Sequence, residues 1–379
     1  IREVISKYGV ETTRFYMNAI MDYAERRMVT AIEEIPRGTY AFEDFLEGDG
    51  LTDDLLKIRA ALSIDEGKVR VDFTGTAPQA RGSVNCTRAV TLACVYYGLK
   101  SAIGSGLPSS GGTFRPVEVI TPEGTLVNPR FPAPVSNANI NTSQRITEVI
   151  LGALAQVIQE RVPAASTGSM SIFTVGGVDP RSDGYYSYVE TYGGGQGALI
   201  NEDGMDGVHV HMTNTMNTPT EVIEIAYPLR VERYGLVPDS EGPGRRRGGL
   251  GLTREVTTVG HRATISIGTE RRNIRPWGLM GGKEGGGSDA WIVDPNGEKR
   301  PLPAKTTTQV EAGTRIVLRT AGGGGFGDPL EREPERVARD VLEGFIGEKR
   351  AREAYGVVLD EAGRPDGVAT ERLRKSREG

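Results

Sequence analysis

The 379-residue sequence contains only two cysteines, Cys86 and Cys94, which excludes both a disulfide-stapled scaffold and a four-cysteine zinc site. So few cysteines favour a reducing, cytoplasmic compartment. Long apolar runs are also lacking. None approaches the roughly 20 residues that span a bilayer, so no membrane partner is expected. The first eight residues show no charged and apolar segments of a signal peptide, and the start at Ile1 indicates a processed or truncated polypeptide.

A basic excess is lacking too, because 45 Lys and Arg residues face 50 Asp and Glu residues. Nucleic-acid binding is therefore not expected. The sequence has no Walker loop, no Rossmann fingerprint and no Gly-x-Ser-x-Gly elbow. The run Gly322-Gly-Gly-Gly-Phe-Gly327 could wrap a phosphate as a backbone nest, but the Asp-Pro pair after it does not fit a Walker loop. If ATP is used, we expect it to be bound by another region or by a separate protein chain.

Glycine is abundant by contrast, with 51 residues that gather in short runs. Glycine accepts positive φ and lets backbones or ligands approach closely. Two explanations stay open: tight turns between many strands, or loops that cradle a ligand. The runs are Gly193-Gly194-Gly195, Gly248-Gly249, Gly281-Gly282, Gly285-Gly286-Gly287 and residues 322–325.

A chain of this length exceeds what one hydrophobic core usually serves, so two or three packed units are expected. The patterning predicts an α+β fold: an N-terminal helix and mixed α/β region, a long β-rich middle domain, and short C-terminal helices. The charged tail from Glu361 is expected to fray. The predicted parts are 1–52 (N-terminal helical segment), 53–165 (mixed α/β domain), 166–330 (β-rich domain) and 331–379 (C-terminal helices and tail).

Particular patterns support these assignments. Apolar residues at helical spacing predict helices across residues 17–28 and after Asn141, where Asn141 and Gln144 form a plausible cap pair. Residues 58–64 and 69–73 alternate in hydrophobicity on either side of a Gly-containing turn, which predicts a β-hairpin.

Two of the three histidines form the pair His209-x-His211. Residues 208–212 alternate in hydrophobicity and predict a strand, on which both imidazoles would share one face and could bind one metal ion. The alternative is a pair of half-buried histidines beside a turn. His261 is the sole other histidine, and no spacing identifies a third ligand.

Alternating asparagines precede the second helix in the run Asn137-x-Asn139-x-Asn141-Thr-Ser143. Helix N-termini attract anions, and amide and hydroxyl groups would add neutral donors. Asn139, Asn141 and Ser143 are therefore predicted to bind substrate. The alternative is an ordinary capping loop.

A second polar motif reads Asn214-Thr-Met-Asn217-Thr-Pro-Thr-Glu221-x-x-Glu224. Two carboxylates three residues apart lie on one side of a helix and could position a water molecule or a cation. We predict Asn214, Asn217 and Glu221 as catalytic residues. The alternative is an exposed helix start, where acidic residues are favoured by the helix dipole.

Ordered motifs run along nearly the whole chain, and together they make it similar to one protein family. They are Asp72-Phe-Thr-Gly-Thr76 with Asn85, Pro122-Glu-Gly-Thr-Leu-Val-Asn-Pro129, Asn139-x-Asn-Thr-Ser143, Tyr192-Gly-Gly-Gly195, Asp203-Gly204, Asn214-x-x-Asn217-x-Pro-x-Glu221-x-x-Glu224, Asp239-Ser-x-Gly-x-Gly-x-Arg246-x-Gly-Gly249, Pro276-x-Gly278 with Gly281-Gly282, and residues 322–329 with Val341 and Tyr355-Gly356. The chain thereby resembles the hydantoinase B/5-oxoprolinase family.

The resemblance implies a B-type subunit of an ATP-dependent cyclic amide hydrolase. Such an enzyme opens a hydantoin, 5-oxoproline or lactam ring through a phosphorylated intermediate, and its ATP is held by a hydantoinase A-type partner. A divalent metal is also implied, held by an N-terminal region whose His- and Asp-rich motifs this sequence does not contain. That region would lie on a separate chain or be missing. The alternatives are a subunit of an ATP-dependent ketone carboxylase of the acetone or acetophenone type, or a non-catalytic scaffold subunit.

Carried over residue by residue, the resemblance implies that six polar side chains line the active-site cavity. They are Asn139, Asn141, Asn214, Asn217, Glu221 and Arg246.

Overall fold

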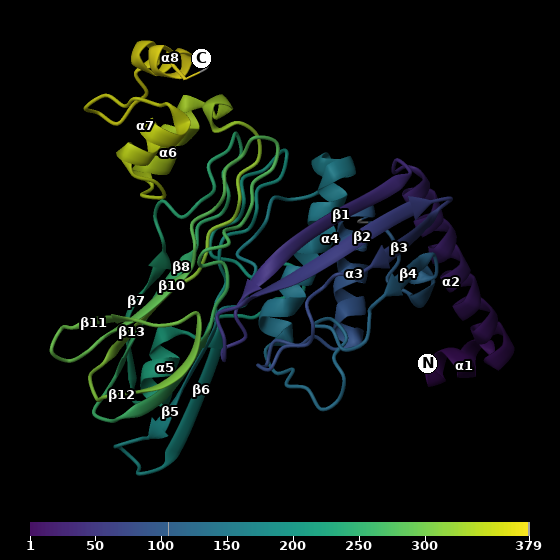
Figure 1. Ribbon diagram of the computed structural model, residues 1–379, viewed down its shortest axis with the longest axis horizontal. Coiled ribbons are helices and arrows are strands. Elements are labelled where there is room, and N and C mark those ends of the chain that lie inside the picture. The colour runs from purple at the N-terminus through teal and green to yellow at the C-terminus, as the bar shows by residue number, and fades with distance from the viewer. Residues whose placement is uncertain (105, 378–379) are drawn as a thin grey trace.

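The computed structural model describes residues 1–104 and 106–377, and it confirms the predicted α+β fold (Figure 1). An N-terminal unit of helices on a small sheet lies beside a β-rich unit, and three helices close the C-terminal end. Four single-turn elements complete the described chain: η1 (Gly111–Phe114), η2 (Ala138–Thr142), η3 (Gln159–Arg161) and η4 (Pro329–Glu331).

The N-terminal unit has one four-stranded sheet in the order β1-β2-β3-β4. Its strands are β1 (Gly38–Glu47), β2 (Leu55–Asp65), β3 (Lys68–Asp72) and β4 (Val117–Ile120). β2 and β3 form the predicted hairpin, and β4 pairs with β3 in parallel. β1 pairs with β2 along its whole length, so the sheet crosses the predicted boundary at residue 52. The domain limits stay a prediction.

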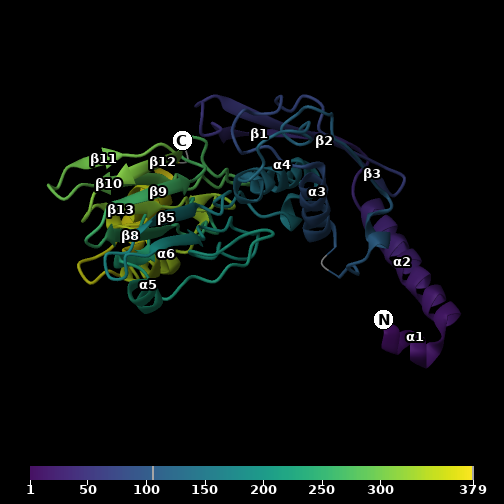
Figure 2. The ribbon, with the colours of Figure 1, turned by 90° about the horizontal axis from the view of Figure 1, so that it is seen from below.

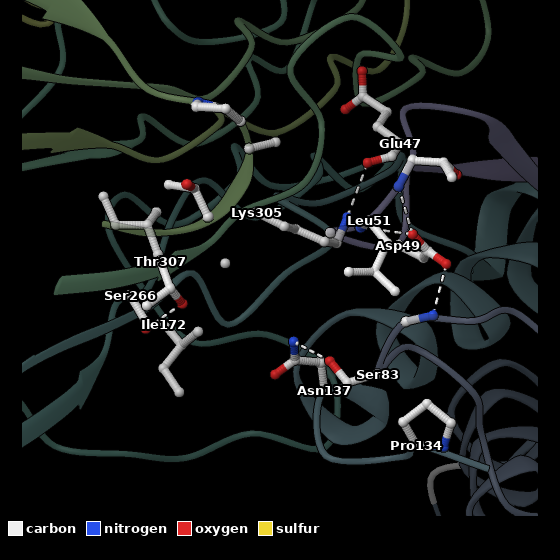
Figure 3. A pocket seen from close by; sticks show the side chains of 18 of the residues that line it. Glu47, Asp49, Leu51, Ser83, Pro134, Asn137, Ile172, Ser266, Lys305 and Thr307 are labelled. Carbon is white, nitrogen blue, oxygen red and sulfur yellow. Dashed lines mark hydrogen bonds between the residues drawn. The ribbon is translucent and has the colours of Figure 1, made fainter. Parts of the chain in front are cut away.

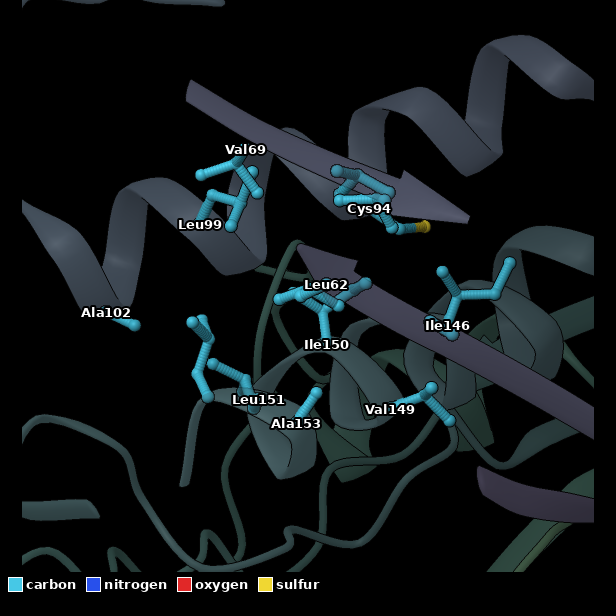
Figure 4. Close-up of a cluster of buried hydrophobic side chains, with 14 of the residues drawn as sticks. Leu62, Val69, Cys94, Leu99, Ala102, Ile146, Val149, Ile150, Leu151 and Ala153 are labelled. Carbon is cyan, nitrogen blue, oxygen red and sulfur yellow. The ribbon is translucent and has the colours of Figure 1, made fainter. Parts of the chain in front are cut away.

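Two helices pack against each other under this sheet, α3 (Arg88–Ile103) and α4 (Ser143–Ile158). Figure 4 shows Leu62 and Val69 of the sheet close to Leu99 of α3 and Ile150 of α4. The helices approach closely because α3 has Gly98 at the contact, where a Cβ would lie 2.9 Å from Ile150 Cγ2. Every residue of α4 from 143 to 155 is buried, as expected for a helix that is covered on all sides.

Two further helices lead away from this unit, α1 (Arg2–Tyr8) and α2 (Val10–Glu33) (Figure 2). The helix predicted for residues 17–28 is thereby confirmed. Among the helices of the described residues, none is both long and apolar enough to cross a membrane.

The β-rich unit is a sandwich of two antiparallel sheets with a shared core that includes Val175 and Ile265 of one sheet and Ile292 and Ile316 of the other. The helix α5 (Thr220–Ala226) adds Ile223 to this core. One sheet has the order β11 (Lys299–Pro301), β10 (Asp289–Val293), β13 (Arg315–Arg319), β8 (Leu252–Thr258), β7 (Leu229–Leu236). The other has the order β12 (Lys305–Val310), β9 (Ala263–Gly268), β5 (Ile172–Val178), β6 (Tyr185–Thr191).

The glycine runs form a bundle of extended segments that extends from the sandwich towards the C-terminal helices (Figure 1). We call this the glycine bundle: residues 322–327 surrounded by residues 164–167, 194–198, 240–251 and 276–286. The backbone N–H groups of residues 322 to 327 all donate to carbonyls of the surrounding segments, at 2.7–3.0 Å. A Cβ at Gly323 would lie 2.0 Å from the Gln196 carbonyl oxygen, so only glycine permits this spacing.

The C-terminal helices are α6 (Pro334–Leu342), α7 (Glu348–Tyr355) and α8 (Gly367–Lys375). The expectation that the tail frays from Glu361 is wrong, because residues 367–375 are helical. Asp366 caps α8 by accepting a hydrogen bond from the Ala369 N–H, and the hydroxyl of the buried Thr370 accepts from the Val358 N–H at 3.0 Å.

The glycine bundle gives a first testable prediction. Gly323→Ala is expected to lower the Tm by about 5–10 °C, equivalent to about 3 kcal/mol, because its methyl group collides with a carbonyl that cannot move away. The control is Gly235→Ala, whose new Cβ would meet no described atom within 4 Å. Thermal unfolding that is equal in the two variants would contradict the close packing of the bundle.

Candidate functional site

A pocket of about 480 Å³ lies between α3, the start of α4 and the loop 212–215. We call it the amide pocket, because asparagine and glutamine side chains form much of its wall. Its lining residues are Ala89, Val90, Ala93, Asn139, Ser143, Gln144, Met170, Met212, Thr213, Asn214 and Thr215. Three residues predicted from the sequence, Asn139, Ser143 and Asn214, therefore meet at one place.

The π-helical turn η2 separates the alternating asparagines and places them in three environments. Asn137 lines a second cleft, Asn139 lines the amide pocket, and Asn141 is fully buried, with its Oδ1 accepting a hydrogen bond from Ser169 Oγ at 2.8 Å. The predicted cap pair of Asn141 and Gln144 is wrong. The chain enters α4 through η2, and the Ser143 N–H already donates to the Ala138 carbonyl, so that turn needs no side-chain cap.

Two buried amides have unused hydrogen-bonding capacity, Gln144 in the pocket wall and Asn141 outside it. Gln144 Nε2 donates to Thr213 Oγ1 at 3.3 Å, which joins α4 to the loop 212–215. The Gln144 Oε1 and Asn141 Nδ2 atoms are buried without a partner among the described residues. An unsatisfied buried polar atom costs about 1–3 kcal/mol, so Gln144 favours the binding of a polar ligand or water in the pocket.

Buried charged side chains follow Gln144 along α4: Arg145 is the next residue, and Glu148 lies one helical turn further on. Arg145 Nη1 contacts Asp44 Oδ2 at 3.0 Å, and Arg271 Nη2 contacts the same oxygen at 2.9 Å and pairs with Glu148. Glu148 also accepts from His211 Nε2 at 3.5 Å. Burial opposes the ionisation of Glu148, but Arg271 and His211 outweigh it and hold its pKa at about 2.

The predicted strand over residues 208–212 is wrong, and with it the shared face of the two histidines. Within that stretch only Val208 makes a β-bridge, and His211 has a φ of 56°, outside the β region. His209 Nε2 is buried without a partner in the described chain, and burial lowers the pKa of this ring, whereas His211 contacts Glu148. His261 bonds to Tyr186, away from both.

The donor set does not fit a metal centre. Within residues 1–104 and 106–377, no three His, Cys, Asp or Glu side chains come together as metal ligands. The residues 322–327 do not fit an ATP phosphate either, because all of their N–H groups donate within the glycine bundle. The phosphate-nest interpretation and the ligand-cradling explanation of this run are therefore wrong.

The remaining predicted residues lie apart from the amide pocket. Asn217 Nδ2 donates to the Tyr234 hydroxyl, and Glu221 is exposed on α5. Glu224 Oε1 accepts from the Val231 N–H at 2.9 Å, so this carboxylate binds the start of β7. The Arg246 backbone pairs with Phe326 in the glycine bundle. Roles for Asn217, Glu221 and Arg246 in the reaction stay proposals.

A larger cleft, of about 830 Å³, lies between the two units (Figure 3). Several of its polar side chains already have partners. Asn137 Nδ2 donates to Ser83 Oγ at 2.8 Å, and Lys305 Nζ contacts the Glu47 carbonyl and Glu270. The asparagine motif contributes only Asn137 to this cleft, so we take the amide pocket as the candidate site.

Sequence reasoning missed Gln144, Met170, Met212 and Thr213 in the pocket, and the buried charges that follow Gln144 along α4. A signal for the charges was present: Arg145 and Glu148 interrupt a helix that is otherwise almost wholly apolar. Charged residues in such a helix must be paired when they are buried. Nothing in the sequence pattern pointed to the two methionines.

The structure defines an α+β protein with a neutral pocket lined in part by amide side chains. Residues 1–329 match the family described as Hydantoinase B/oxoprolinase. The chain belongs to this family, which confirms the resemblance seen in the sequence.

Relatives in this family are longer than the chain. It is 35% identical to a putative D-/L-hydantoinase of Pseudomonas sp. (strain NS671), in its B-type component, over 98% of this chain and 64% of the relative. It is 31% identical to the beta component of the caprolactamase of Pseudomonas jessenii, over 97% of this chain and 65% of the relative. The chain thus spans slightly less than two thirds of each relative.

Two solved structures share the fold. The ATP-dependent caprolactamase from Pseudomonas jessenii superimposes with a TM-score of 0.88 at 27% identity, over 98% of this chain and 66% of that one. The nucleotide-free structure of acetone carboxylase gives a TM-score of 0.84 at 20% identity, over all of this chain and 57% of that one, which shows a common fold alone.

The buried charges give a second prediction. Arg271→Leu is expected to destabilise the protein by about 3–5 kcal/mol, because it leaves Glu148 and Asp44 without their shared partner. Arg262→Leu serves as the control, since Arg262 pairs with Glu311 at an exposed site worth under about 1 kcal/mol. Urea unfolding measures both, and equal midpoints would contradict the pairing.

A third prediction concerns the stability of the protein at low pH. The pKa of Glu148 is about 2 in the fold against 4.5 normally, so its stabilising contribution is present above pH 4.5 and is lost as the pH falls towards 2. That contribution is about 3 kcal/mol near neutral pH. The difference in unfolding free energy between the wild type and Glu148→Gln is expected to narrow by about 2 kcal/mol between pH 7 and pH 3.

The matched control for this pH series is Glu361→Gln, at an exposed position. That variant should follow the wild-type pH profile. A difference between Glu148→Gln and the wild type that does not change with pH would show that Glu148 is not held ionised by its partners.

Proposed function

We propose that this chain is the B-type subunit of an ATP-dependent enzyme that opens a cyclic amide: a hydantoin, 5-oxoproline or a lactam. The amide pocket is the observation that carries the proposal. A cyclic amide presents one carbonyl acceptor and one N–H donor, and the side chains of Asn139, Gln144 and Asn214 offer both complementary groups. The named activities of the hydantoinase and caprolactamase relatives agree with this substrate class.

The chemistry accounts for ATP and a partner protein. An unstrained cyclic amide is a poor electrophile, and the γ-phosphoryl group of ATP, transferred to the amide oxygen, makes the ring carbon reactive. Water adds to that carbon, the C–N bond breaks, and the nitrogen takes up a proton. A second water molecule hydrolyses the resulting acyl phosphate, so the sum is cyclic amide, ATP and two waters giving amino acid, ADP and phosphate.

The residues of the amide pocket fit a binding role in this sequence of steps. Among the described lining residues none has a side chain that titrates near neutral pH, so they bind and orient the ring rather than exchange its protons. Phosphoryl transfer is assigned to a hydantoinase A-type subunit, and the hydrophobic wall of Val90 and Met170 limits the access of bulk water.

The fourth prediction tests this function. The native complex, purified through a tag on this chain, is expected to open a lactam or hydantoin only when ATP is present. Asn139→Ala and Asn214→Ala should each lower kcat/KM by about tenfold or more, the loss expected for one hydrogen bond to bound substrate. The control is Asn201→Ala at an exposed turn.

Three results would contradict the proposal. Opening of a lactam without ATP would show that the reaction has no phosphorylated intermediate. Bicarbonate-dependent carboxylation of acetone or acetophenone, with no ring opening, would favour a ketone carboxylase. Full turnover in the folded Asn139→Ala and Asn214→Ala complexes would favour a scaffold subunit with its chemistry elsewhere.

A further inference from the structure

We infer that the amide pocket selects uncharged cyclic amides, such as lactams and hydantoins, over rings that bear a carboxylate, such as 5-oxoproline. The inference rests on the proposed function and narrows its substrate class. It follows from where the charged side chains around the pocket lie and from what each of them already binds.

The wall of the pocket is neutral. Five of its eleven described lining residues are apolar, and the other six bear only amide or hydroxyl groups. A carboxylate bound there would lose part of its hydration and find no cationic side chain among these residues in return. Burying an unpaired charge is far costlier than burying a hydrogen-bonded amide, so the neutral ring is favoured.

Two buried cations near the first turn of α4 are already engaged. Arg145 follows Gln144 in α4, but its guanidinium is completely buried and contacts Asp44 at 3.0 Å and Glu270 at 3.3 Å. Arg271 is equally buried between Asp44 and Glu148. Neither side chain can turn to a ligand without breaking two buried ion pairs, which would cost several kcal/mol.

His211 directly precedes Met212 of the pocket wall, but its ring contacts the carboxylate of Glu148. Its Nε2 contacts Glu148 Oε1 at 3.5 Å, and Tyr97 of α3 lies edge-on to its ring at 5.9 Å. A ligand carboxylate that approached this ring would also approach Glu148, a buried anion. The electrostatic potential beside Glu148 therefore does not favour the carboxylate of a ligand.

The N-terminus of α3 is a positive feature at the rim, where Ala89 and Val90 line the pocket. A helix end provides roughly half an elementary charge, and solvent screens it at exposed positions such as Ala89. A bound carboxylate would gain typically about 0.3–1 kcal/mol from the helix end, and under about 1 kcal/mol from the exposed Arg88 that begins α3. Both gains are small beside its lost hydration. We therefore expect discrimination, although not complete exclusion.

The lining of the pocket includes both kinds of surface that a lactam ring presents. Val90, Met170 and Met212 present apolar surface for methylene groups. Asn139 and Gln144, both near the start of α4, present amides for the ring C=O and N–H. The helices α3 and α4, which supply Val90 and Gln144, pack against each other (Figure 1).

The test uses two ligands of nearly equal size that differ in charge, 5-oxoproline and 5-oxoprolinamide, with the native complex. Direct binding is measured by titration calorimetry, and turnover is measured separately with ATP. The uncharged amide is expected to bind at least about tenfold more tightly, which corresponds to about 1.4 kcal/mol. Equal or tighter binding of the acid would overturn the inference, as would binding of neither compound at millimolar concentration.

A designed cation provides the second arm. Ala93 lies at an exposed pocket position on α3, so Ala93→Lys should bring an ammonium group to a bound carboxylate and improve 5-oxoproline binding about fivefold relative to the amide. The control, Ala93→Met, has a similar length without charge. No difference between the two variants would mean that the ring binds elsewhere, and would overturn the inference.

The binding and turnover measurements test the pocket selectivity and the proposed function separately. Selective binding of the amide without ATP-dependent ring opening would contradict the proposed function and support the pocket selectivity. Ring opening with a preference for 5-oxoproline would support the proposed function and contradict the selectivity.

Discussion

The position of α4 depends on six buried charged side chains, and the amide pocket depends on α4. Three cations and three carboxylates from the two units pair at the boundary between them: Arg145, Arg271 and Lys305 with Asp44, Glu148 and Glu270. Buried charges are stabilised only when their partners are in place. The packing of the β-rich unit therefore determines where the first turn of α4, with Ser143 and Gln144, meets the loop 212–215.

The glycine bundle imposes the second constraint. Its segments are joined by backbone hydrogen bonds at spacings that leave no room for a Cβ, as at Gly195, Gly248 and Gly323. Residues 164–167 of the bundle directly follow the region of α4, and the Ser166 N–H donates to Glu148 Oε1 at 2.8 Å. The glycine bundle and the buried charges thus meet at Glu148. This residue links the glycine segments to α4, one helical turn after Gln144 of the pocket wall.

Periodicity in the sequence predicted α2, α4, the β2–β3 hairpin and the β-rich middle, because hydrophobic spacing decides these elements locally. It failed where tertiary contacts decide the backbone. Residues 208–212 alternate like a strand, yet His211 has a positive φ and faces Glu148. Asn139, Ser143 and Asn214, which the sequence motifs predicted as site residues, line one pocket. The turn η2 places Asn137 and Asn141 outside it. Glycine abundance was visible, but its cause, close packing of extended segments, requires the three-dimensional arrangement.

A crystal structure of the native complex with a neutral lactam or hydantoin bound would test the proposed site most directly. We expect the ring between α3 and α4, with its amide edge within hydrogen-bonding distance of Asn139 or Gln144 and its methylene edge against Met170 or Met212. A ring found in the larger cleft beside Lys305, or on a partner protein far from this chain, would contradict the account.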